Sequence, residues 1–178
     1  MKPALLLAFL LPLVSIAANA ADDSFDRVLP GAYQDVLQGA SSAYDKKDFA
    51  RAFELNQRGA CAGDKTSQAI LGRMYILGQG VPRDDVTGYA WVRLAADFSF
   101  ADFTSLARKL EAAMTPEQKK AGEAKADVLR KNYGPAATNM SCHGVSRRGV
   151  YLIDSVVCTP ESEGGRLLLR RCAEAPAN

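Results

Sequence analysis

The stretch Gly72–Asp97, GRMYILGQGVPRDDVTGYAWVRLAAD, contains two apolar segments with helical spacing, separated by the break GQGVPRD at residues 78–84. Such a break is either a Gly-rich loop that holds an anion at a helix N-terminus or the turn of a helical hairpin. An anion-binding loop would follow a strand and carry Lys, Ser or Thr at the helix start, whereas here a helix precedes the break and Asp84 and Asp85 stand at the start of the next helix. The stretch therefore predicts a helical hairpin.

The flanking sequence continues this pattern and predicts six helices arranged in pairs. Apolar residues recur three and four positions apart, and capping residues such as Thr115, followed by Pro116, mark the helix starts. Gly63, Gly72 and Gly88 are small residues that favour close approach of neighbouring helices. The six predicted helices span about residues 32–45, 48–62, 64–78, 84–96, 101–113 and 115–132.

The last forty residues have a different character. Two apolar or β-branched runs, 150–158 and 166–172, predict a β-hairpin with residues 159–165 as its loop. A third strand is predicted near residues 139–145, and the tail 173–178 is expected to be disordered. The expected organisation is a signal peptide at 1–20, a helical repeat domain at 21–135, and a disulfide-linked β-hairpin with its tail at 136–178.

The first twenty residues have the pattern of a secretory signal. Lys2 precedes a short apolar run, and Ala18 and Ala20 form an A-x-A cleavage site. After cleavage near Ala20 the net charge is +1, because the 22 Lys and Arg residues lose Lys2 and face 20 Asp and Glu residues. The charges are interspersed, which argues against a nucleic-acid partner, and no later run predicts membrane insertion. We expect a soluble protein that is periplasmic or secreted.

The helical part resembles the Sel-one-like repeat family, a relative of tetratricopeptide arrays. The resemblance rests on the elements L-G-x-x-Y, G-x-G-V-P-x-D and A-W-x-x-L-A-A within residues 64–97, and it is weaker for residues 44–64. It implies a mainly α-helical short solenoid of hairpins, with Trp91 packed between repeats. It also implies a protein–protein interaction scaffold or adaptor in the bacterial envelope.

A repeat array of this kind binds its partner, another protein, on the concave face lined by the first helix of each pair. The aromatic cluster Phe98, Phe100 and Phe103 is either packed in the core or part of an exposed interaction patch. The alternative function is a periplasmic inhibitor or immunity protein that binds a toxic enzyme. The candidate contact residues are Arg73, Tyr75, Gln79, Arg83, Phe98, Phe100 and Phe103.

The residues argue against catalysis and against a cofactor or metal. His143 is the single histidine, it stands beside Cys142, and no Cys-x-x-Cys or His-x-x-x-His spacing occurs. Some cysteine-rich relatives are linked to β-lactam binding or hydrolysis, the third function considered. However, Ser-x-x-Lys is missing from the sequence and Lys65-Thr66-Ser67 is a poor match to Lys-Thr-Gly. We therefore expect a protein that is not an enzyme.

The four cysteines of an exported chain are expected to form two disulfides. In the predicted hairpin Cys158 and Cys172 do not face each other, so a bond between them is disfavoured. Cys61 then pairs with either Cys172 or Cys158. The preferred pairing is Cys61–Cys172 with Cys142–Cys158, because the second bond closes a short loop.

Overall fold

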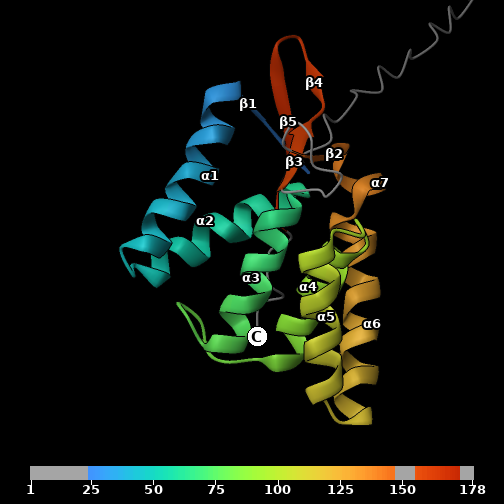
Figure 1. Ribbon diagram of the computed structural model, residues 1–178. Helices are drawn as coiled ribbons and strands as arrows, with labels where there is room; N and C mark the ends of the chain where they lie inside the picture. Colours follow the sequence, from blue (N-terminus) through green and yellow to red (C-terminus); the bar gives the residue numbers. More distant parts are fainter. Residues whose placement is uncertain (1–23, 147–154, 173–178) are drawn as a thin grey trace, which may run out of the picture.

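The computed structural model describes residues 24–146 and 155–172 (Figure 1). The predicted signal peptide, the start of the predicted strand at 150–154 and the predicted disordered tail lie outside the described residues. The six predicted helices are present with bounds close to those expected. The first four form two successive pairs, while the last two, predicted as a third pair, each pack against the fourth. The six helices are α1 (Pro30–Asp45), α2 (Phe49–Ala62), α3 (Lys65–Leu77), α4 (Asp85–Ala96), α5 (Ala101–Ala113) and α6 (Pro116–Tyr133).

Local capping explains where these helices begin and end. Three of them start after an aspartate whose side chain accepts a hydrogen bond from the backbone N–H three residues later. These aspartates are Asp48, Asp64 and Asp84. Thr115 and Gln118 form a reciprocal capping box at the start of α6. Gly63 and Gly78 end α2 and α3 in the left-handed conformation.

The hairpin predicted from the opening stretch is formed by α3 and α4, which cross at two glycines. A Cβ atom on Gly72 would lie 2.6 Å from the carbonyl oxygen of Gly88, and a Cβ atom on Gly88 would lie 2.7 Å from that of Gly72. The backbones are therefore in contact where the sequence placed small residues. Behind this crossing, Trp91 of α4 lies in a buried cluster with Cys61, Leu71 and Tyr133.

The strand pairing differs from the predicted hairpin. The strand β3 (Ser155–Pro160) pairs antiparallel with β2 (Met140–Val145), the predicted third strand. The strand β5 (Arg166–Arg170) instead pairs with β4 (Ser162–Glu163) and with β1 (Phe25–Val28), which was not predicted. The predicted pairing of 150–158 with 166–172 across a loop at 159–165 is therefore wrong.

A two-residue turn is the reason for this difference. Gly164 and Gly165 both have positive φ angles, of 57° and 75°, and pair Glu163 with Arg166 directly. The hairpin is consequently short, and the chain before it turns away to pair with β2. The β1 strand, from the N-terminal side of the helices, occupies the other edge of β5.

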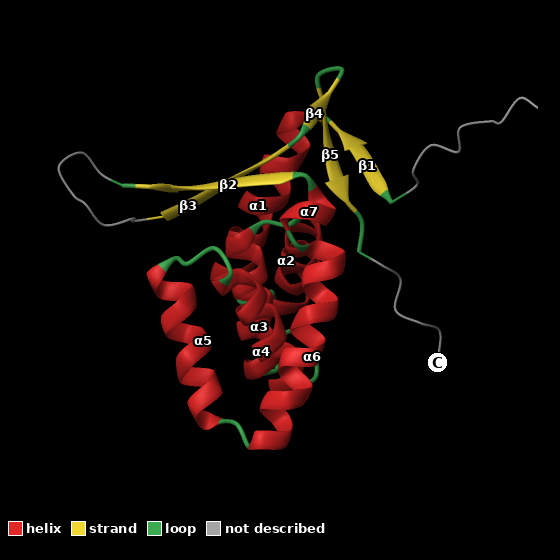
Figure 2. Cartoon of the chain, turned by 90° about the vertical axis from the view of Figure 1, so that its right-hand side faces the viewer, coloured by secondary structure: helices red, strands yellow, loops and turns green. Residues whose placement is uncertain are grey.

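Both small sheets lie at one end of the helical array (Figure 2). The short helix α7 (Pro135–Thr138) leads from α6 into β2. Met140, Cys158 and Leu169 from the strands form a buried cluster with Tyr33 of α1 and Ala62 of α2. The sheets therefore extend the hydrophobic core over the end of the first hairpin, and this places β3 beside α1 and α3.

Candidate functional site

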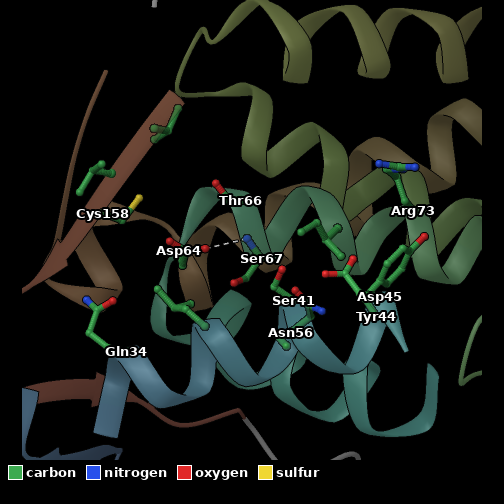
Figure 3. Close-up of a pocket in the computed structure, with 15 residues that line it drawn as sticks. Gln34, Ser41, Tyr44, Asp45, Asn56, Asp64, Thr66, Ser67, Arg73 and Cys158 are labelled. Atoms are coloured by element: carbon green, nitrogen blue, oxygen red, sulfur yellow. Dashed lines mark hydrogen bonds between the residues drawn. The ribbon is translucent and has the colours of Figure 1, made fainter. Parts of the chain in front are cut away.

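A groove of about 550 Å³ lies between α1 and α3 and is bounded at one end by β3 (Figure 3). Leu37, Tyr44 and Asp45 contribute from α1, and Ile70 and Arg73 contribute from α3. These are the first helices of the first two pairs, while α2 and α4 pack behind them. The groove therefore occupies the face on which the sequence predicted partner binding.

Asp64 fixes the start of α3 on the groove floor. Its carboxylate accepts a hydrogen bond of 2.6 Å from the Ser67 backbone N–H, and the Tyr33 hydroxyl lies 3.5 Å from its Oδ2. Burial raises the pKa of Asp64, an effect that its hydrogen bonds with Ser67 oppose. Burial likewise raises the pKa of the Tyr33 hydroxyl, with the Asp64 charge as a second cause. These contacts attach α1 to the N-terminus of α3.

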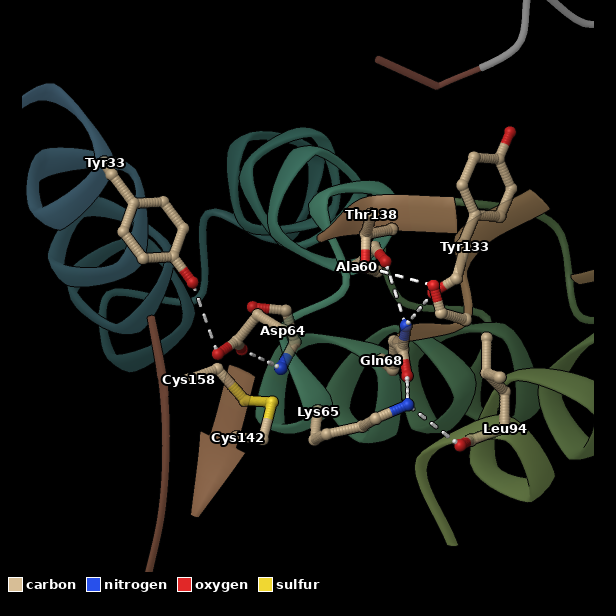
Figure 4. Close-up of a disulfide and its surroundings, with 12 residues drawn as sticks. Tyr33, Ala60, Asp64, Lys65, Gln68, Leu94, Tyr133, Thr138, Cys142 and Cys158 are labelled. Atoms are coloured by element: carbon tan, nitrogen blue, oxygen red, sulfur yellow. Dashed lines mark hydrogen bonds between the residues drawn. A yellow bond between two sulfur atoms is a disulfide. The ribbon is translucent and has the colours of Figure 1, made fainter. Parts of the chain in front are cut away.

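A buried polar network beneath the groove joins four helices (Figure 4). Lys65 Nζ donates to Gln68 Oε1 at 3.1 Å and to the Leu94 carbonyl at 3.3 Å. Gln68 Nε2 donates to the carbonyls of Ala60 and Tyr133, both at 3.1 Å. Side chains on α3 thereby donate hydrogen bonds to backbone carbonyls of α2, α4 and α6. These bonds attach α3, which forms one wall of the groove, to the helices behind it.

Burial also changes the ionisation of Lys65, which is 2% exposed. Desolvation lowers its pKa to about 8, although the charges of Asp97 and Asp64 raise it and Arg130 lowers it further. Burial of Lys65 and Gln68 was not predicted, because polar residues in a first helical turn usually face solvent. The sequence signal for their burial was their spacing, because residues three positions apart lie on the same side of a helix, here the side that carries the apolar residues of α3.

The exposed charges of the groove lie at the end away from β3 (Figure 3). Within the part of the chain that the structure describes, the side chains of Arg73 and Asp45 form no ion pair. Arg73 is exposed on α3, and Asp45 is exposed at the end of α1. Between them and β3 the lining is partly apolar, with Leu37 and Ile70 on opposite walls. The groove thus offers one exposed cation and one exposed anion at this end, and a lining of mixed apolar and polar side chains between them and β3.

The predicted contact residues are not all brought together. Arg73 lines the groove, and Gln79 accepts a 2.9 Å hydrogen bond from the groove residue Tyr44. Tyr75 is half-buried and packs edge-on against Phe53, with ring centroids 5.3 Å apart. Arg83 is exposed in the α3–α4 turn and forms an ion pair with Asp85. A role for these four residues in partner binding stays a prediction.

The aromatic cluster contributes mainly to the core. Phe100 and Phe103 are each 8% exposed and pack edge-on with centroids 5.0 Å apart, and Phe98 is half-buried against the same cluster. Val156 of β3 also packs there. Little of Phe100 or Phe103 is left for a partner to contact.

The structure contains the disulfides Cys61–Cys172 and Cys142–Cys158, the pairing preferred from the sequence. The geometric reason differs from the predicted one, since Cys158 lies directly opposite Cys142 across β2 and β3. His143, next to Cys142, is exposed on β2. Among the described residues, no group of three or more His, Cys, Asp or Glu side chains could hold a metal ion.

A solved structure with the same helical arrangement identifies the fold. It is a protective antigen present in uropathogenic Escherichia coli strains, described as displaying an SLR fold. The helical part of this protein has an SLR fold. The superposition has a TM-score of 0.50 with 27% sequence identity, and it covers 61% of this chain but only 23% of that chain. No family model and no curated protein matches the sequence.

An SLR fold accounts for the position of the groove, because stacked hairpins expose a concave surface lined by their first helices. Two disulfides are typical of proteins in oxidising compartments outside the cytosol. In the described ranges, no helix has the length and hydropathy needed to cross a bilayer.

Proposed function

We propose that this SLR protein is exported to the bacterial envelope, where it acts as an interaction scaffold that binds a segment of another protein in the α1–α3 groove. The observation that carries the proposal is the groove itself, a concavity of about 550 Å³ with a partly apolar lining and exposed charges of both signs at one end. A polypeptide supplies both charges, whereas a simple anion or cation would be repelled by Asp45 or Arg73.

The proposal assigns no catalytic role to the protein. The groove brings Asp64 and Ser67 together, but the Asp64 carboxylate is committed to capping α3. An acyl-transfer site would also need a general base near the hydroxyl. His143, the single imidazole, belongs to β2 and does not line the groove.

Site-directed photocrosslinking in cells tests the proposed function. A photoreactive residue at Ile70 should crosslink to a specific protein, while one at the exposed Val128 of α6 should not. The purified partner should then bind the Arg73→Ala variant about tenfold more weakly, as expected for a lost charged contact. Arg108→Ala is the matched control, because Arg108 is also exposed and without an ion pair among the described residues. Equal binding by both variants would refute the groove as the interaction site.

The proposed export has a separate test. N-terminal sequencing of the protein recovered from the periplasm or the medium should give Ala21 as the first residue. Recovery of uncleaved protein in the cytosol, with reduced cysteines, would contradict the assignment to the envelope.

A further inference from the structure

The end wall of the groove is the edge of a strand. Val156, Val157 and Cys158 all line the groove, although consecutive side chains of a strand point to opposite faces of the sheet. Cys158 is buried, Val156 packs on the phenylalanine cluster, and Val157 is 43% exposed on the other face. Three consecutive residues can share one cavity if the cavity meets the strand at its backbone edge. The groove therefore borders the backbone of β3.

The register shows which backbone groups of β3 are directed away from β2. The Cα atoms of Cys142 and Cys158 are 4.0 Å apart, a spacing typical of a pair without mutual backbone hydrogen bonds. The Glu161 N–H donates to the Asn139 carbonyl, so the hydrogen-bonded positions of this chain segment are odd-numbered. Val157 and Thr159 therefore bond to β2.

It follows that the N–H and C=O groups of Val156 and Cys158 point outward from the β2–β3 pair. Within the described residues these four groups have no hydrogen-bond partner. Unpaired backbone groups at a strand edge form a template for a further strand. The two residues are about 7 Å apart along β3, which matches the two-residue repeat of an extended peptide.

We propose that the partner segment binds in an extended conformation and adds to the free edge of β3 as a third strand. This inference rests on the proposed function, and it names the conformation and the main-chain contacts of the bound segment. The backbone of the segment donates hydrogen bonds to the carbonyl groups of Val156 and Cys158 and accepts hydrogen bonds from their N–H groups. The segment also places an apolar side chain between Leu37 and Ile70. A helical segment could not do this, because its backbone groups are bonded internally.

The position of the edge also selects among possible occupants. A second copy of the chain that presented its own β3 edge would bring its helices with it, because β3 lies across the end of the helical array. A folded copy is therefore a bulkier occupant of this groove than a single extended segment. A flexible extended segment can enter the groove, and mixed charge along it complements Arg73 and Asp45. The occupant is therefore a strand-forming peptide segment of a different protein.

A peptide library tests this inference. Random heptapeptides displayed on phage are selected on the mature disulfide-bonded protein, and those that bind the Arg73→Ala variant at least about tenfold more weakly are kept as groove binders. The tightest of these is synthesised with a single backbone N-methyl group at each position in turn. We expect losses of about tenfold at alternate positions and little change between them, because only alternate N–H groups face β3.

Amide hydrogen exchange provides a second measurement. The Val156 and Cys158 amides should exchange fast in the free protein and slowly in the complex, while those of Val157 and Thr159 are protected in both. Val156→Pro should weaken peptide binding without breaking the β2–β3 ladder, since that N–H faces outward. Val145→Thr, at an exposed position of β2 outside the groove, is the control and should bind as the parent protein does.

The outcomes separate this inference from the proposed function. If N-methylation is tolerated at all positions and the Val156 and Cys158 amides stay unprotected, the peptide binds through side chains and strand addition is refuted, while the groove stands. If no selected peptide depends on Arg73, both proposals fail. A dimer in which the Val156 amide is protected without peptide would also overturn the inference.

Discussion

The indole ring of Trp91 stacks on the phenol ring of Tyr133, with centroids 5.6 Å apart and planes inclined by 21°. The contact joins α4 to the end of α6, and Trp91 is only 6% exposed. The same part of α6 supplies the Tyr133 carbonyl that Gln68 bonds from α3. The end of α6 is therefore joined to α4 by this aromatic stack and to α3 by a buried hydrogen bond, in addition to the packing of α6 along α4.

Truncation of this stack should be costly. Trp91→Ala is expected to lower the free energy of unfolding by about 3–5 kcal/mol, the range for truncation of a buried large aromatic side chain. Urea denaturation followed by circular dichroism measures the loss, because the variant has no tryptophan. Val128→Ala, at a position that is 57% exposed, should change stability by less than about 0.5 kcal/mol. A loss below about 1 kcal/mol for Trp91→Ala would show that the stack is not part of the stable core.

The buried Lys65 should make stability depend on pH. Its pKa is about 8 in the folded chain against a usual value of 10.5, so between these values the unfolded chain binds more protons. Stability attributable to Lys65 therefore rises as pH increases from about 8 toward 10, by at most about 1.4 kcal/mol per pH unit, and it is constant below that window. The raised tyrosine pKa values act in the opposite direction near and above pH 10.

A comparison of variants isolates this effect. The unfolding free energy of the parent protein relative to Lys65→Met should rise between pH 8 and 10, because the tyrosine contributions cancel. Val128→Ala, at an exposed position without an ionisable side chain, should give a flat difference. A flat difference for Lys65→Met as well would mean that Lys65 is not desolvated in the folded protein.

The crossing of α3 and α4 predicts opposite effects for two glycine substitutions. Gly72→Ala adds a methyl group 2.6 Å from a backbone carbonyl, and it should destabilise the protein by about 1–3 kcal/mol. Gly31→Ala, in the first turn of α1, meets no atom within 4 Å and should be neutral or stabilise by up to about 1 kcal/mol. Thermal denaturation of both variants measures the difference. Equal midpoints would contradict the close crossing.

The two disulfides should contribute unequally. Cys61–Cys172 joins α2 to the segment that follows β5 across 111 residues, whereas Cys142–Cys158 spans 16. Removal of Cys61–Cys172 by paired serine substitutions should lower the free energy of unfolding by about 2–4 kcal/mol. This loss should exceed the loss for the short disulfide by about 1–2 kcal/mol, because a cross-link that closes a longer loop restricts the unfolded chain more. Peptide mapping without reduction verifies the pairing, and a Cys158–Cys172 peptide or a free Cys61 thiol would refute it.

The helices could be predicted because their signals are local. Asp64, Asp84 and Thr115 cap helices through the backbone of the next few residues, and Gly63 and Gly78 end them through their own φ angles. The repeat pattern around Trp91 then indicated the fold and the face on which the groove lies. None of these inferences required knowledge of residues far along the chain.

The strand pairing and the binding groove depended on the tertiary structure, because they arise from residues that are far apart in sequence. The run at 155–160 is compatible with pairing to β2 or to β5, and the choice follows from the Gly164–Gly165 turn and from β1, which occupies an edge of β5. Only this choice leaves an edge of β3 beside α1 and α3. Likewise, Lys65 and Gln68 have polar side chains that a sequence places at the surface, and the carbonyls of three other helices make their burial favourable.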